Sequence, residues 1–203
     1  MSFTCGRGWH GEMDYMARHG VKRSRPGDLV AGTVRVISVR MDYRPSGVRD
    51  SVRVLNEPER AFISRYALGR DYHRVMRRRL QRLADRISGE VGPFNYRAFT
   101  DSAPVMEVAL AEKAGLGWRG KHTLLLNREG GSYFFLGELY TNLPLPVDAP
   151  AEDHFGTFLK CLAACPTGAI VASFELDARR CISSLTLELK GSIPAALRPL
   201  IRP

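Results

Sequence analysis

The spacing of apolar and polar residues predicts a protein built from both helices and strands. The strongest pattern follows Asp71, where Met76, Leu80, Leu83 and Ile87 recur at helical spacing. These side chains share one face of a long helix, which we expect to pack on the core. A second face carries an arginine at every fourth position: Arg74, Arg78, Arg82 and Arg86. This row is either a solvated helix face or a contact for phosphates.

Shorter patterns predict the remaining elements. Strands are expected at Thr33–Met41, His122–Leu126 and Tyr133–Tyr140, with a turn at Asn127–Gly131 between the last two. Short helices are expected at Glu12–His19 and Val105–Ala114, the second preceded by the helix-start residues Asp101, Ser102 and Pro104. Three prolines between Leu143 and Pro150 predict a stiff linker. We therefore expect an α+β fold, with a mixed sheet and flanking helices over residues 8–145, a Pro-rich linker over 146–154 and a small segment over 155–192.

Composition adds a class of partner and excludes others. The chain has 203 residues, of which 44% are hydrophobic and 25% charged, as in an ordinary globular protein. No apolar run reaches the roughly 18 residues of a membrane span, and the N-terminus lacks the apolar core of a secretory signal, so we expect a cytoplasmic protein without membrane contact. The net charge of +9 is carried mainly by arginine. It favours a polyanionic partner, although genomic base composition also enriches arginine.

The cysteines supply the sharpest chemical signal. Cys5 stands alone, whereas Cys161, Cys165 and Cys181 lie close together near the end of the chain. The bacterial ferredoxin run is C-x2-C-x2-C-x3-C-P, and Cys161 and Cys165-Pro166 occupy its last two cysteine positions. Phe155 and Phe158 stand at the first two positions, where phenylalanine cannot bind iron.

Five stretches in the right order resemble the epoxyqueuosine reductase family. They are residues 11–16, 65–73, 101–105, 113–121 and 176–183, within a resemblance that runs from about Gly8 to Pro203. The resemblance implies an oxidoreductase that uses cobalamin and two [4Fe-4S] clusters. Its reaction reduces epoxyqueuosine to queuosine in tRNA, the final step of queuosine biosynthesis. The implied macromolecular partners are a tRNA with a queuosine-type anticodon and an electron-donor protein.

The resemblance also implies roles for individual residues. Asp101 matches the family's proposed proton donor beside the cobalt, and Asp71 and His73 match polar neighbours in the same cavity. Residues that match contacts to cobalamin or its surroundings are Arg23, Ser64, Asp101, Ser183 and Lys190. Cys161 corresponds to a ligand of the first cluster, and Cys165 and Cys181 correspond to ligands of the second.

Departures from the family pattern leave alternatives open. Family members continue with a further cysteine-rich segment and a helical-repeat domain that engages tRNA, whereas this chain stops at Pro203. We therefore expect a truncated ferredoxin-like segment with incomplete clusters. The chain is then an active reductase, a non-catalytic cobalamin- or tRNA-binding remnant, or a decayed gene product. The cysteines are leftover packing residues, a partial or intermolecular cluster, or a zinc site completed by His154. Without the resemblance, Asp101 reads as a helix-start residue.

Overall fold

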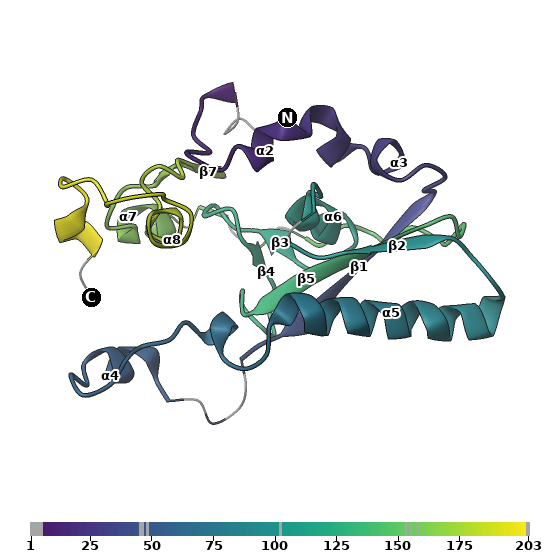
Figure 1. The fold of residues 1–203 in the computed structure, drawn as a ribbon, viewed down its shortest axis with the longest axis horizontal. Helices are drawn as coiled ribbons and strands as arrows, with labels where there is room; N and C mark the ends of the chain where they lie inside the picture. Colours follow the sequence, from purple (N-terminus) through teal and green to yellow (C-terminus); the bar gives the residue numbers. More distant parts are fainter. Residues whose placement is uncertain are drawn as a thin grey trace.

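The fold is built around a three-stranded sheet. The computed structural model describes residues 6–44, 47, 49–101, 103–152, 154, 156–157 and 159–201, so Cys5, Ser102, Phe155 and Phe158 lie outside the described residues. Helix α5 runs along one face of the sheet, while α6 and the N-terminal elements lie on the other (Figure 1). The expected α+β class, with helices flanking a sheet, is confirmed.

The sheet has the strand order β1–β5–β2, and both pairings are antiparallel, so the described strands form an antiparallel sheet and not the expected mixed one. Strand β1 spans Arg35–Asp42, β2 spans Tyr96–Phe99, and the central β5 spans Phe134–Thr141. Leu139 of β5 lies opposite Ile37 of β1 and Ala98 of β2. The expected strands at Thr33–Met41 and Tyr133–Tyr140 are thus confirmed with small shifts, whereas β2 was not foreseen.

Helix α5, Tyr72–Val91, confirms the strongest sequence pattern. Met76, Leu80 and Ala84 are buried against Leu139 of the central strand. Gly137 allows this close approach, because a Cβ atom at that position would lie only 3.0 Å from Met76 Cγ and 3.1 Å from Leu80 Cδ1. The helix therefore packs directly on the backbone of β5.

Helix α6, Glu107–Lys113, covers the opposite face of the sheet. Val105, just before this helix, packs with Phe99 and Tyr140 of the sheet. The expected helix start at Asp101 is wrong, because Asp101 adopts φ +44°, a left-handed conformation that cannot open an α-helix. Asp101 instead lies in the loop that joins β2 to α6.

The β3–β4 hairpin differs from its expected form. Strand β3, Trp118–Arg119, pairs with β4, Leu125–Leu126, so only the end of the expected strand His122–Leu126 forms. Thr123 with φ +76° and the bond from Thr123 N to Gly120 O make a tight turn of the preceding residues. An antiparallel bridge between Asn127 and Gly131 confirms the predicted turn there.

Short helices make up much of the N-terminal half. The expected helix Glu12–His19 is shortened to α2, Tyr15–Arg18, and a 3₁₀ turn, η1, follows at Gly20–Ser24. The other short elements of this half are α3 at Pro26–Leu29, α4 at Ser51–Leu55 and η2 at Arg65–Ala67. Among the described helices, none has the length and apolar character that crossing a bilayer requires.

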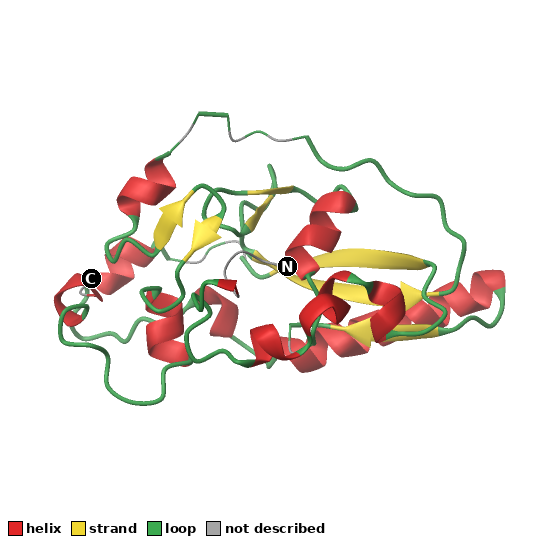
Figure 2. Ribbon diagram, turned by 90° about the horizontal axis from the view of Figure 1, so that it is seen from above, coloured by secondary structure: helices red, strands yellow, loops and turns green. Residues whose placement is uncertain are grey.

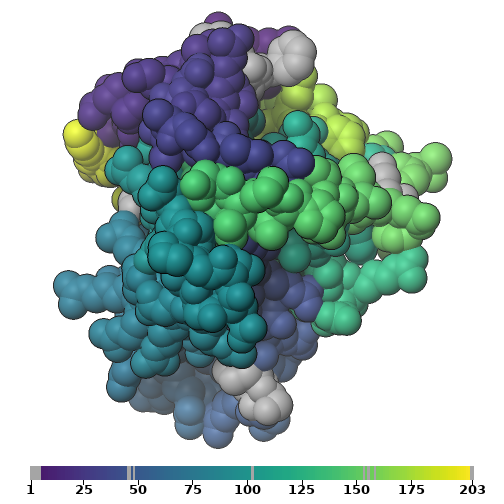
Figure 3. Space-filling view, turned by 90° about the vertical axis from the view of Figure 1, so that its right-hand side faces the viewer, coloured from purple at the N-terminus to yellow at the C-terminus, as the bar shows by residue number. Residues whose placement is uncertain are grey.

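A long segment without helix or strand follows β5 and leads to α7 (Figure 2). It crosses one side of the molecule as a green band between the purple N-terminal elements and the blue-green region of α5 (Figure 3). Arg35 Nε holds it through a hydrogen bond of 2.7 Å to Leu145 O. Its limits as a linker, and the domain limits at 8–145 and 155–192, stay predictions.

The C-terminal part is a cluster of short elements. It contains α7 at Lys160–Ala164, β6 at Ile170–Ala172, β7 at Glu175–Leu176, α8 at Ile182–Leu187 and η3 at Arg198–Ile201. Two hydrogen bonds attach it to the N-terminal segment, from Ala178 N to Trp9 O and from Lys190 N to Glu12 Oε2. The N-terminal segment and the C-terminal cluster therefore lie against each other.

Candidate active site

The structure brings together the three predicted catalytic residues. His73 Nδ1 lies 2.8 Å from Asp71 Oδ1, and His73 Nε2 lies 3.0 Å from Asp101 Oδ2. Asp71 caps α5, and its carboxylate also accepts the backbone N–H of His73. The hydrogen bond with His73 lowers the pKa of Asp71. An imidazole between two carboxyl groups donates to both only when it is doubly protonated, or else one carboxyl carries the proton itself.

Tyr72 is a fourth member of this group, which the sequence did not single out. Its hydroxyl donates a hydrogen bond to Asp101 Oδ2. Its ring stacks on Phe135 of β5 with centroids 3.9 Å apart, and on His73 at 4.0 Å. Burial, followed by the hydrogen bond to Asp101, raises the pKa of Tyr72, so its hydroxyl is a neutral donor at physiological pH. In the sequence, the position of Tyr72 between Asp71 and His73 was the signal that could have identified it as a site residue.

Asp101 is held by its backbone as well as by its side chain. Its backbone N–H donates to Glu107 Oε1, while Oδ2 accepts from Tyr72 and faces His73. A positive φ at a non-glycine residue costs energy and is kept only where surrounding contacts hold it. The side chain of Asp101 remains 56% exposed, which leaves its carboxyl group accessible to a substrate.

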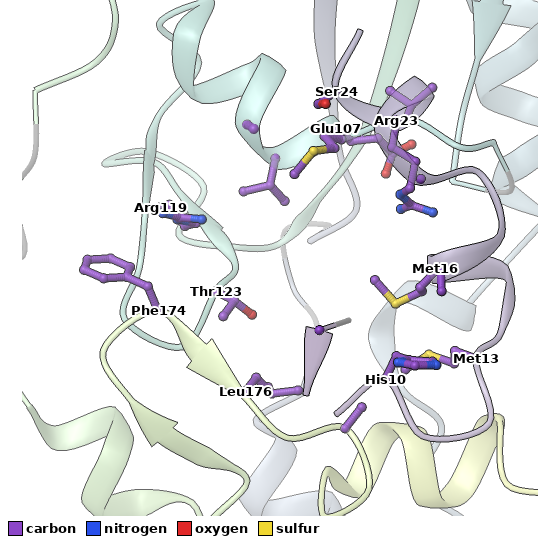
Figure 4. A pocket seen from close by; sticks show the side chains of 18 of the residues that line it. His10, Met13, Met16, Arg23, Ser24, Glu107, Arg119, Thr123, Phe174 and Leu176 are labelled. Carbon is purple, nitrogen blue, oxygen red and sulfur yellow. The ribbon is translucent and has the colours of Figure 1, made fainter. Parts of the chain in front are cut away.

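A cavity of about 470 Å³ is lined by Glu107, whose Oε1 atom accepts the hydrogen bond from Asp101 N. Met13, Met16 and Arg23 lie on one side of it, and Arg119 and Leu176 lie across from them (Figure 4). Its walls come from the N-terminal segment, from α6 and its preceding loop, from the β3–β4 hairpin and from the C-terminal cluster. The cavity is therefore broad and largely apolar, with a few charged groups.

Two glutamates adjoin this site, the half-buried Glu107 and the fully buried Glu138, and neither was foreseen. Burial raises the pKa of Glu107 to about 7, against the opposing effect of the hydrogen bond from Asp101 N. Glu138 of β5 is fully buried, and neither carboxyl oxygen has a hydrogen-bond partner among the described residues. Burial, and secondarily the charge of Glu107, raises the pKa of Glu138 to about 9. Glu138 is therefore a neutral carboxylic acid at pH 7.

The predicted cofactor contacts have different surroundings. Arg23 lines the cavity, and its Nη1 atom lies 3.5 Å from Tyr15 O. Ser183 is exposed on α8, next to the cavity-lining Ser184. Ser64 precedes η2 and Lys190 follows α8, and both are exposed positions outside the cavity lining. The structure thus gives Arg23 a cavity position, and all five cofactor assignments, that of Asp101 included, stay predictions.

The three described cysteines are not assembled into a metal site. Among the residues that the structure describes, no three His, Cys, Asp or Glu side chains are grouped to hold a metal ion. His154, the fourth ligand of the zinc alternative, instead packs edge-on against Trp118 and lies 3.1 Å from Arg128 Nη2. His154 thus has other contacts in this structure, and the cluster and zinc assignments of Cys161, Cys165 and Cys181 stay predictions.

Cys165 nevertheless has the surroundings of a thiolate. Burial alone would raise the pKa of its thiol, but hydrogen bonds from Ile170, Thr167 and Ala169 outweigh that effect and lower the pKa. The Ala169 N to Cys165 Sγ distance is 3.3 Å. Donors around a sulfur atom stabilise its negative charge, which a metal ligand must carry.

Known proteins that are similar to this chain include epoxyqueuosine reductases. The family described as "Epoxyqueuosine reductase QueG, DUF1730" matches residues 23–102. An epoxyqueuosine reductase of Pseudomonas aeruginosa is 65% identical over 196 residues, which cover 96% of this chain and 54% of that protein. The chain spans about half the length of the curated relatives it matches.

Solved structures agree with the sequence match. A Bacillus subtilis epoxyqueuosine reductase, solved with its catalytic aspartate loop swung out of the active site, has a TM-score of 0.77 and 35% identity, covering 89% of this chain and 47% of that one. An epoxyqueuosine reductase solved with an epoxyqueuosine-modified tRNA-Tyr stem loop has a TM-score of 0.76 and 30% identity, covering 93% and 54%. Over the span that it shares with them, this chain is similar in sequence and fold to epoxyqueuosine reductases.

Proposed function

We propose that the chain carries out the proton-transfer part of epoxyqueuosine reduction in tRNA, with Asp101 as the proton donor. The observation that carries this proposal is the placement of Asp101 Oδ2 between the hydroxyl of Tyr72 and the imidazole of His73, next to a cavity-lining glutamate. The tRNA stem loop in one solved relative and the catalytic aspartate loop named for another support the proposal. A cytoplasmic location fits the same activity and stays a prediction.

The reaction sets the number of protons that the site must handle. An epoxide takes up two electrons and two protons and leaves as an alkene and water. After the ring opens, the released alkoxide needs a proton, which the carboxyl group of Asp101 donates. The carboxylate that remains accepts hydrogen bonds from Tyr72 and His73, and these two donors stabilise its charge. The protein side chains thus supply and hold protons but contain no suitable reductant.

The walls of the cavity offer contacts for part of the corrin ring of cobalamin, the cofactor that the resemblance implies. Met13, Met16 and Leu176 give it apolar walls suited to the faces of a corrin ring. His10 Nδ1 is buried on the cavity wall without a hydrogen-bond partner among the described residues, and it could bond an amide of the corrin periphery. Arg23 offers a second polar contact. Cobalamin, when bound, supplies the electron pair that opens the epoxide.

Exchange of Asp101 for asparagine tests the proposal. The chain is supplied with cobalamin, a strong chemical reductant and an epoxyqueuosine-containing stem loop. We expect Asp101→Asn to abolish product formation, because the amide keeps the shape but cannot deliver the proton, and to leave cobalamin binding nearly unchanged. Asp148→Asn, an exposed position in the segment after β5, is the matched control and should retain activity. Equal turnover by Asp101→Asn and the unmodified chain would exclude Asp101 as the donor.

A non-catalytic cobalamin- or RNA-binding protein is the second candidate. The observation that favours it is the largely apolar cavity with Arg23 in its wall, which could hold a ligand whether or not a reaction follows. Cobalamin binding without turnover, even with the chemical reductant, would support this candidate over the first. Turnover under those conditions would exclude it.

A further inference from the structure

Helix α5 presents arginines that are not used within the protein. Arg78, Arg82 and Arg86 are exposed on the side of α5 that faces away from the buried Met76 and Leu80. Within the described part of the chain, these three arginines form no ion pair and no hydrogen bond. We call them the α5 arginine stripe.

The acidic residues of α5 neutralise this stripe only in part. Asp85 lies on the same side of the helix, and its Oδ1 atom accepts a hydrogen bond of 2.8 Å from Gln81. Glu90 is exposed in the last turn. Like charges one helical turn apart destabilise a helix. Three arginines at that spacing therefore favour an external anion that compensates them.

The stripe leads away from the candidate active site. Asp71, which contacts His73, caps the same helix, and Arg74 beside it lies 3.6 Å from Asp71 Oδ2. At a rise of 1.5 Å per residue, the distance from Arg74 to Arg86 along the helix is about 18 Å. Figure 1 shows α5 at the edge of the molecule, with the sheet on one side of it only. An anionic chain entering the site can therefore continue along the outer side of α5.

We propose that the α5 arginine stripe binds the phosphate backbone of the RNA whose modified base enters the site. The identity of this RNA rests on the proposed function, whereas the surface rests on the charges of α5. Arginine stays charged at all physiological pH values and binds phosphate through two N–H groups. A helix that binds a lipid surface needs an apolar face toward the lipid, but the apolar face of α5 is buried on the sheet. An RNA strand therefore fits this surface better than a membrane does.

The salt dependence of RNA binding gives the expected magnitude. Each single-stranded phosphate contact contributes about −0.7 to the slope of log K against log salt concentration. The variant Arg78→Gln, Arg82→Gln, Arg86→Gln should therefore flatten the slope by about 2. The electrostatic contribution vanishes at about 1 M salt. At about 0.1 M salt the stripe variant should therefore bind the RNA about 100-fold more weakly than the unmodified chain.

The experiment titrates the 203-residue chain with a labelled anticodon stem loop, without cobalamin or reductant. Binding is measured between about 0.05 and 0.3 M salt, a range wide enough to give the slope. The matched control is Arg25→Gln, Arg128→Gln, Arg198→Gln, which removes three exposed charges outside α5. We expect the control to keep most of the affinity and slope that the stripe variant loses. Since backbone contacts do not read sequence, an unmodified stem loop should be affected equally.

Several results would overturn the proposal. The stripe variant could bind RNA like the unmodified chain, or the control variant could lose as much affinity as the stripe variant. The unmodified chain could also bind no RNA at about 0.05 M salt, where phosphate contacts are strongest. A stripe variant that loses only its binding to anionic vesicles would also overturn it in favour of a membrane contact. This experiment measures RNA binding and no turnover. The proposal for the α5 arginine stripe can therefore be confirmed while the proposed reductase function fails, and the reverse.

Discussion

Glu138 should make the protein less stable as the pH rises through neutrality. Its carboxyl group has an ordinary pKa of 4.5 in an unfolded chain, and burial raises this pKa to about 9 in the folded protein. Between these two values the folded state binds more protons than the unfolded state, so the free energy of unfolding falls as pH rises. The stabilising effect is fully present below pH 4.5 and is lost progressively up to pH 9.

The magnitude follows from the size of the pKa shift. One pH unit within this window changes the free energy of unfolding by about 1.4 kcal/mol. Between pH 5 and pH 7, two units inside the window, Glu138 should therefore remove about 3 kcal/mol. A typical domain has a free energy of unfolding of roughly 5–15 kcal/mol, so this loss is a large part of it. Such a loss is within reach of an ordinary denaturation experiment.

The variant Glu138→Gln isolates this effect, because glutamine has nearly the same shape and does not titrate. The free energy of unfolding of both proteins is measured by urea denaturation at pH 5, 6, 7 and 8. The difference between the two proteins should grow by about 1.4 kcal/mol per pH unit in favour of the variant. A constant offset from the new amide does not affect this slope. Parallel pH dependences of the two proteins would refute the reasoning.

Two further predictions concern the metal content and the packing of α5. Anaerobic reconstitution should yield fewer than the eight irons of two [4Fe-4S] clusters, because two clusters need eight thiolates and the chain has 4 cysteines; iron analysis that finds eight per chain would contradict this. Gly137→Ala should lower the free energy of unfolding by about 1–3 kcal/mol, since the new methyl group meets Met76 and Leu80 at contact distance. A melting temperature equal to that of the unmodified chain would mean that α5 moves aside without cost.

Strong periodicity explains which elements the sequence predicts well. Helix α5 repeats its apolar positions over five turns, so its existence and its buried face follow from the sequence. Strand β2 has only four residues, which is too short to show an alternation. The helix expected at Asp101 fails for another reason. The residues from Asp101 onward form a loop instead, in which the backbone N–H of Asp101 donates to the side chain of Glu107 at the start of α6.

The candidate site was predicted in its exposed part and missed in its buried part. Asp71, His73 and Asp101 came from resemblance, and the structure brings them into hydrogen-bond distance. Glu138 was available as a charged residue on the buried side of an otherwise apolar strand, a pattern that usually marks a special role. Glu107 gave no such signal, because a glutamate in the first turn of a helix is common.

The separate origins of the proton-handling residues and the cavity walls bear on how the protein folds and evolves. Asp71, Tyr72, His73 and Asp101 all belong to one continuous stretch, in which α5 runs out along the sheet and β2 returns. The cavity instead joins the two ends of the chain, from His10 to Ser184. The contact between His73 and Asp101 joins residues 28 apart, whereas the cavity joins residues far apart in the chain, so the first unit closes at a lower cost in chain entropy. Substitutions can therefore change the walls of the cavity during evolution while the proton donor and its hydrogen-bond partners are retained.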